Sequence, residues 1–127
     1  MSAWYSIVSI TGKDIVLNSD GKMELAFTYV SDAISGLFFV LLNGDELVYN
    51  ISDTSEIVTV RGLAELVVSL CPEKGLKVVV DIPEDRSGYL QSKVAFLDSG
   101  KVEELEWRKT VLLTDGLKRT RTYFTTN

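Results

Sequence analysis

Apolar and polar residues alternate along much of the chain, and three segments show the alternation most clearly: residues 22–30, 76–82 and 105–113. Neighbouring side chains of a β-strand point to opposite faces, so each segment would present one apolar face and one mostly polar face. This pattern is typical of antiparallel sheets that cover a core on one side only. In the third segment Trp107 lies on the apolar face, and we expect it in the core.

Glycine-containing turns separate these segments from other apolar stretches. The strongest hairpin signal is Asn43-Gly44, between residues 37–42 and 47–51, because both turn residues tolerate a positive φ. The pattern predicts a mainly β protein at the margin of α+β, an antiparallel meander that forms a β-sandwich or a partly open barrel. The expected strands cover residues 4–10, 14–17, 22–30, 37–42, 47–51, 76–82, 89–97, 105–113 and 117–125.

One segment favours a helix instead. Leu63, Leu66, Val67 and Leu70 recur with the spacing of one helical face, and Cys71-Pro72 follows them. We therefore predict one short helix near residues 62–71, ending at the proline. Residues 56–61 are compatible with either a strand or a helical turn.

Length and composition limit the class of protein. The chain has 127 residues, of which 46% are hydrophobic and 24% charged, as expected for one globular domain spanning residues 1–127. Its densest apolar run, residues 37–42, is far shorter than the roughly 18 residues of a membrane-spanning helix. Cys71 is the only cysteine and the N-terminus lacks the features of a signal peptide, so we expect a cytoplasmic protein with Cys71 buried.

Several catalytic and cofactor sites are excluded or unsupported. The sequence contains no histidine, which rules out a Ser-His-Asp triad and mixed Cys/His zinc sites. It also lacks the phosphate-binding motifs GxxxxGK[ST] and GxGxxG. Acids at residues 81–85 and 103–106 are interpreted as solvated side chains, and Asp32, Asp45, Glu46 and Asp53 lack EF-hand spacing. We therefore expect no metal, no cofactor and no enzymatic activity.

Charge suggests a function. The net charge is −5, and residues 1–60 carry two bases against eight acids. An acidic surface repels nucleic acid and attracts a basic protein. We therefore predict a cytosolic binding protein, such as an acidic inhibitor or an immunity protein, that blocks a basic partner. The candidate partner-binding residues are Asp45, Glu46, Asp53 and Glu56.

Two alternatives remain open. In the first, the chain is a β-barrel carrier in which Arg119, Arg121 and Tyr123, alternating along one strand, bind a small anionic ligand. In the second, it is a self-associating structural subunit, for example of a viral particle, and residues 37–42 form the interface of a homo-oligomer. Phe38 and Phe39 support this idea, because adjacent rings on a strand cannot both enter one core. Neither alternative involves nucleic acid or a membrane.

Overall fold

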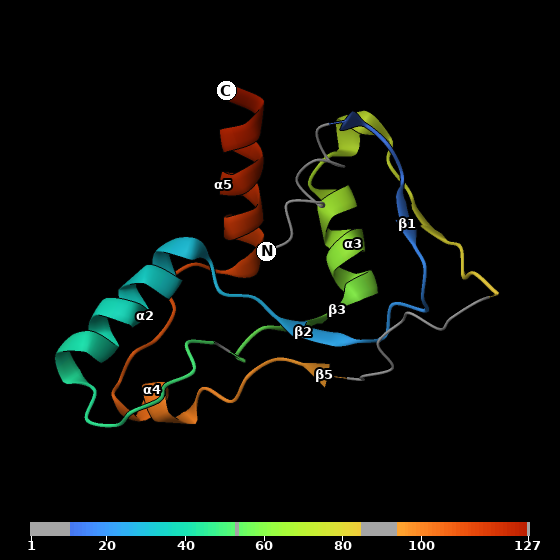
Figure 1. The fold of residues 1–127 in the computed structure, drawn as a ribbon. Coiled ribbons are helices and arrows are strands. Elements are labelled where there is room, and N and C mark those ends of the chain that lie inside the picture. Colours follow the sequence, from blue (N-terminus) through green and yellow to red (C-terminus); the bar gives the residue numbers. More distant parts are fainter. Residues whose placement is uncertain (1–10, 53, 85–93, 127) are drawn as a thin grey trace.

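The computed structural model describes residues 11–52, 54–84 and 94–126. Within these ranges, helices account for more of the chain than strands, and the strands are two or three residues long (Figure 1). In chain order the elements are β1 (Ile15–Leu17), β2 (Glu24–Ala26), α2 (Val30–Asn43), β3 (Ile57–Thr59), α3 (Val60–Ser69), the 3-10 turn η1 (Pro72–Lys74), β4 (Val78–Val80), β5 (Val94–Ala95), α4 (Gly100–Glu104) and α5 (Leu113–Thr126).

The described strands form two small sheets. β1 pairs in parallel with β4, with Ile15 opposite Val78. In the second sheet β2 lies between β3 and β5, antiparallel to β3 and parallel to β5. Parallel neighbours need long crossover connections, whereas a meander needs short hairpins. The prediction of a mainly β antiparallel meander, as a sandwich or a barrel, is therefore wrong.

Two predicted strands are helices. Residues 37–42 lie in α2 and residues 117–125 lie in α5. The first segment is apolar at every position, so it has no period that separates a strand from a buried helix. In the second segment the hydroxyls of Thr120 and Thr122 donate to the carbonyls of Gly116 and Lys118, four residues earlier. Those bonds satisfy the threonine hydroxyls on the helix.

Some of the other predicted elements are confirmed and others are not. Strands β1, β2 and β4 fall within the predicted segments 14–17, 22–30 and 76–82. The helix near 62–71 is confirmed as α3, and residues 57–59 before it are strand β3. Residues 47–51 and 105–113 contain no strand. Residues 4–10 and 89–93 lie outside the described residues, so only β5 represents the segment 89–97.

Asn43-Gly44 forms no hairpin. It ends helix α2, where the Gly44 amide donates to Val40 O at 2.7 Å. Gly44 has φ −73°, so this position uses no left-handed backbone. The Asp20-Gly21 turn does need glycine: Gly21 has φ +68°, and an added Cβ would lie 2.8 Å from Cβ of Arg61. This turn brings the chain after β1 close against the start of α3.

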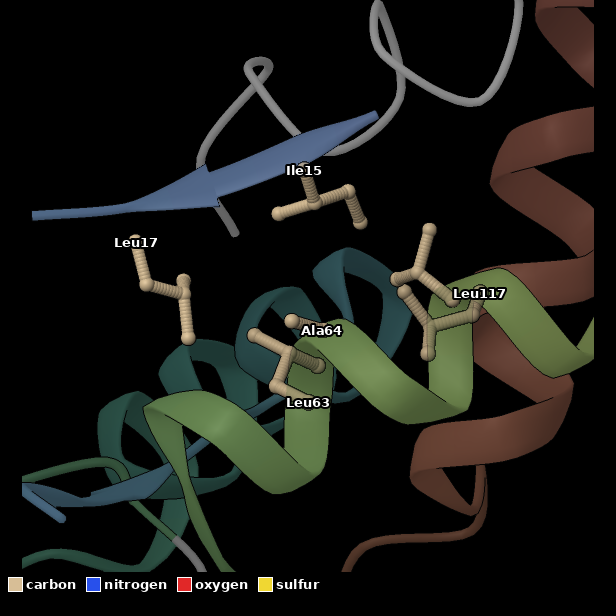
Figure 2. Packing of buried hydrophobic residues seen from close by; sticks show 6 residues of the cluster. Ile15, Leu17, Leu63, Ala64 and Leu117 are labelled. Atoms are coloured by element: carbon tan, nitrogen blue, oxygen red, sulfur yellow. The ribbon is translucent and has the colours of Figure 1, made fainter. Parts of the chain in front are cut away.

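The hydrophobic core surrounds helix α3. Figure 2 shows side chains of β1 reaching toward α3, with Leu117 of α5 beside it. The cluster consists of Ile15, Leu17, Leu63, Ala64, Val67 and Leu117. Thr59 caps α3, because its Oγ1 accepts from the Gly62 amide at 3.0 Å. Cys71, just after the helix, is buried as predicted. Among the described residues, no helix has the length and apolar character needed to cross a membrane.

Candidate functional site

Asp32 joins the start of α2 to the connection between α4 and α5. Its carboxylate accepts hydrogen bonds from the amides of Thr110 and Val111, at 3.0 and 2.8 Å, and from Thr110 Oγ1 at 2.8 Å. Only 2% of Asp32 is exposed. A buried carboxylate requires such donors, because an unpaired buried charge is very costly. Asp32 therefore fixes the 107–112 connection against α2.

The environment of Asp32 has opposing effects on its pKa. Burial disfavours the charged form and raises the pKa, whereas the bonds from Val111 and Thr110, together with nearby Lys109, lower it. The donors outweigh the burial, so the pKa of Asp32 lies below its ordinary value of 3.8. An ionised carboxylate whose oxygens are already occupied is a poor proton acceptor at neutral pH. Asp32 is thus suited to fixing the 107–112 connection against α2 and not to proton transfer.

Glu56 anchors the same connection from the other side. Its Oε2 accepts from Lys109 Nζ at 2.6 Å and from the Leu113 amide at 3.0 Å. The Lys109 side chain is only 6% exposed, so this ion pair is shielded from water on the lysine side. The amide of Leu113 is the first of helix α5, where a negative charge is favourable. Glu56 therefore fixes the beginning of α5.

Trp107 fills the space beneath α2. The prediction that it is a core residue is confirmed, since it is 4% exposed, and its Nε1 donates to Ser35 Oγ at 3.2 Å. Gly36 makes this approach possible. A Cβ added there would lie 2.7 Å from Cγ2 of Ile51 and 3.2 Å from Cε2 of Trp107. The most deeply buried residues of α2 are therefore Asp32 and Gly36, while Phe39 and Val40 are half-buried.

A shallow depression lies beside this junction. It is partly open to solvent and is bordered by residues 27–29 and by Val111, Leu112, Leu113 and Gly116. Gly116 faces the Tyr29 ring, since an added Cβ would lie 2.9 Å from Cδ2 of that ring. Arg119, one turn further along α5, places its guanidinium 5.8 Å from the centre of the ring, within cation–π range. The depression thus has an apolar lining with one exposed cation nearby.

These features favour binding and positioning over proton transfer. The carboxylates of Asp32 and Glu56 are engaged by donors, and Lys109 is held by Glu56. Within residues 11–52, 54–84 and 94–126, no three side chains of metal-binding type gather. The junction can hold two helices and a connection at fixed positions.

The described partner-binding acids each contact a partner within the chain. Asp45 Oδ1 accepts from the Tyr49 hydroxyl at 2.9 Å, Glu46 pairs with Lys101, and Glu56 pairs with Lys109. Asp53 lies outside the described residues. The three described acids are engaged within the chain, so they do not form an unpaired acidic surface. Binding of a basic protein stays a prediction.

The predicted anion ligands also lie apart. Successive helical residues are rotated by about 100°, so Arg119 and Arg121 point to different sides of α5. Arg121 donates to Leu70 O at 2.6 Å and pairs with Glu73, whereas Arg119 lies over Tyr29. The Tyr123 ring packs edge-on against Phe124. The structure therefore does not gather the three residues into one cluster.

The sequence interpretation missed the roles of Asp32, Thr110 and Lys109. One signal for Asp32 was present: it lies shortly before the apolar run of residues 37–42, as an acid in the first turn of a helix does. Thr110 and Lys109 carried no such signal. Their partners lie 78 and 53 residues away in the sequence.

Comparisons with known proteins point to sugar-nucleotide enzymes. No family model matches the chain. It is 26% identical over 131 residues to a trifunctional UDP-glucose 4,6-dehydratase/UDP-4-keto-6-deoxy-D-glucose 3,5-epimerase/UDP-4-keto-L-rhamnose-reductase of Arabidopsis thaliana. That alignment covers 97% of this chain and 18% of the plant protein, so the chain spans about a fifth of its relative.

Solved structures agree with the sequence comparison. The chain resembles UDP-glucose 4-epimerase of Thermotoga maritima with UDP-glucose, at a TM-score of 0.81 and 28% identity over 98% of this chain and 38% of that one. It also resembles a dTDP-glucose 4,6-dehydratase of Streptomyces venezuelae with NAD and TYD bound, at a TM-score of 0.75 and 26% identity, again over 98% of this chain and 38% of that one. The fold is therefore that of part of an epimerase or dehydratase chain.

These similarities overturn the predicted function. The proteins that the chain resembles in sequence and structure are enzymes acting on sugar nucleotides, so the prediction of a non-enzymatic inhibitor or immunity protein is wrong. The same similarities contradict the two alternative functions, a viral assembly subunit and an anion-carrying β-barrel. The sequence interpretation found none of this, because it sought a complete catalytic motif and the chain matches only a part of such enzymes.

Proposed function

We propose that this chain supplies the nucleotide-sugar-binding portion of an NAD-dependent epimerase or dehydratase that acts on nucleoside-diphosphate sugars. The observation that carries the proposal is the similarity to the UDP-glucose-containing epimerase, which extends over 98% of this chain with a TM-score of 0.81. Similarity at both the sequence and the structural level supports a shared class of substrate more strongly than a shared fold alone.

The described residues do not fit a dinucleotide. Pyrophosphate groups of such cofactors are bound at free helix N-termini that follow glycine-rich turns. In the described part of the chain, the N-terminus of α3 is occupied by Thr59 and that of α5 by Glu56. The first turn of α2 carries the negatively charged Asp32. We therefore assign no step of the reaction on NAD to these residues.

The chain's own contribution is to bind and orient. Asp32 and Glu56 fix the connection that borders the depression, and both carboxylates accept hydrogen bonds from within the chain. Binding energy from parts of a substrate remote from the reacting bond can hold that bond in a reactive geometry. We assign this role to the chain and place the reacting groups outside the described residues. The cytoplasm stays the expected compartment.

Ligand binding tests the proposal directly. Saturation-transfer NMR on the purified 127-residue chain would be recorded with UDP-glucose and, as a control nucleotide without a glucose group, with ATP. We expect transfer to both the uracil and the glucose protons of UDP-glucose, and competition by dTDP-glucose. Equal transfer to ATP, or none to UDP-glucose, would contradict the proposal.

A further inference from the structure

Helix α5 buries little of its own surface. Of its fourteen residues, Gly116 and Leu117 are buried, a few more are half-buried, and residues 122–126 at its end are exposed. Helix α3, beside which α5 stands (Figure 1), buries three residues, two of them completely. A segment with few buried apolar contacts opens at a lower free energy than the core. The two helices should therefore differ in how readily they leave the folded structure.

The sequence of α5 also has a low intrinsic preference for the helix. Five of its fourteen residues are threonine and one is glycine, and both types are poor helix formers. Four of the threonine hydroxyls donate to the carbonyl four residues earlier, an arrangement that slightly destabilises a helix. An isolated helix of this length is marginal in water. Contacts with the rest of the chain are therefore needed to keep α5 helical.

The first half of α5 is attached at three points. Glu56 Oε2 accepts from the first amide of the helix at 3.0 Å. Gly116 lies against the Tyr29 ring, and the Arg119 guanidinium lies 5.8 Å from the centre of the same ring. Leu117 packs into the core cluster around α3. These contacts end before the last two turns of the helix.

Arg121 attaches the second half. Its Nη1 donates to Leu70 O at 2.6 Å, and its Nη2 pairs with Glu73. Leu70 caps the C-terminal end of α3, where the helix dipole favours a positive charge. Hydrogen bonds from a charged donor are stronger than neutral ones, so this contact contributes more than its small area suggests. Arg121 thus joins the end of α3 to a helix that buries little else nearby.

We propose that α5 is a strap, a helix that leaves α3 and unfolds as one unit while the α3 core stays folded, and that Arg121 is the contact that holds it closed. Opening removes Leu113 and Gly116 from the border of the depression. It also uncovers the side of the core cluster against which Leu117 packs. The strap goes beyond the proposed function and would operate whatever the substrate.

Native-state hydrogen exchange, followed by NMR on the purified chain in low concentrations of urea, tests the strap. We expect the amides of residues 117–124 to share one opening free energy that depends on urea, with protection factors at least tenfold below those of residues 63–68 in α3. Protection that falls steadily toward Thr126 and does not respond to urea would show simple fraying of the helix end. Equal protection of both helices would show that α5 opens only when the whole chain unfolds. Either result would overturn the proposal.

Thr59→Ala separates partial opening from global unfolding. Thr59 caps α3 at the end far from Arg121, so its contact is kept when the strap is open. The substitution should speed exchange in α3 about fivefold and leave exchange in α5 unchanged. Equal acceleration of both helices would contradict the strap.

Arg121→Met tests the closing contact, because methionine keeps an unbranched stem and removes every donor. Exchange across residues 117–124 should become about tenfold faster. The matched control is Arg61→Met, which removes an exposed pair with Glu65 inside α3 and should leave α5 exchange unchanged. Unchanged α5 exchange in Arg121→Met, or the same acceleration in Arg61→Met, would show that Arg121 does not hold the strap. The wild-type and Thr59→Ala measurements decide the strap itself should Arg121→Met fail to fold.

Discussion

Helices α2 and α3 have opposite relations to the rest of the molecule. Both follow a residue with extended backbone, Tyr29 in one case and Thr59 in the other. Helix α3 buries Leu63, Ala64 and Val67, whereas the buried residues of α2 are Asp32 and Gly36. Helix α3 is held by apolar contacts, whereas α2 is held largely by hydrogen bonds and close backbone approach, and most of its large apolar side chains stay exposed.

The difference explains why mean hydropathy does not reveal which helix is central. α2 has the denser run of apolar residues, yet α3 carries the core (Figure 2). A helix is stabilised within a chain by the side chains that it buries there. Truncating a leucine in α3 should therefore lower the unfolding free energy of the chain much more than truncating a leucine in α2.

The largest effect is expected for Leu63→Ala in α3. Leu63 is completely buried, and truncating such a leucine costs about 3 kcal/mol through lost apolar burial and the cavity left behind. Urea unfolding followed by circular dichroism would show a lower midpoint with an unchanged slope. A loss below about 1 kcal/mol would contradict the central role of α3.

Asp32→Asn should have the next largest effect. The substitution removes the charge that accepts three hydrogen bonds and turns an amide group toward buried donors, at a cost of about 2 kcal/mol. Because the pKa of Asp32 is lowered in the folded state, its contribution is fully present above pH 3.8 and is lost as pH falls through the folded value. The difference in unfolding free energy between wild type and variant should shrink below that pH. A difference that stays constant in acid would contradict the assigned role.

Thr59→Ala should cost less, about 1 kcal/mol, because it removes the N-cap of α3. Thr59→Ser keeps the accepting oxygen and serves as the matched control. The thermal midpoint, compared across the three proteins, would decide: equal midpoints for the alanine and serine variants would show that the cap does not stabilise α3.

The smallest effect is expected for Leu41→Ala in α2. The side chain is 73% exposed, so its truncation should change the unfolding free energy of the chain by less than about 0.5 kcal/mol. The same urea measurement as for Leu63→Ala makes the comparison direct. A cost similar to that of Leu63→Ala would show that α2 is packed within the chain and would remove the contrast between the helices.

The helical periodicity before Cys71 predicted α3, whereas the equally clear strand alternation of residues 105–113 was misleading, because that segment contains no strand. The spacing of Leu63, Leu66 and Val67 located α3, and Asp20-Gly21 located a turn that requires glycine. The sequence interpretation also failed for residues 37–42, where a uniformly apolar segment has no period, and for 117–125, where threonines satisfy their hydroxyls on a helix. The parallel pairing of β1 with β4 was also missed, because short strands contain no information about their partners.

The candidate site was less predictable than the fold. Glu56 was singled out, but as a binding residue on the surface, whereas it holds Lys109 and the first amide of α5. Its role depends on a partner 53 residues away, which no local pattern indicates. Arg119 and Arg121 were assumed to share a strand face, and the helix that contains them separates them.

The long separation between Asp32 and its donors has a consequence for how the molecule assembles. The Val111 amide lies 79 residues beyond the carboxylate that binds it. During synthesis, α2 leaves the ribosome long before that amide exists, and the carboxylate stays hydrated until then. Contacts so distant in sequence slow folding through the entropy of closing the intervening chain. The attachment of α2 to the 107–112 connection can therefore form only after almost the whole chain has been synthesised.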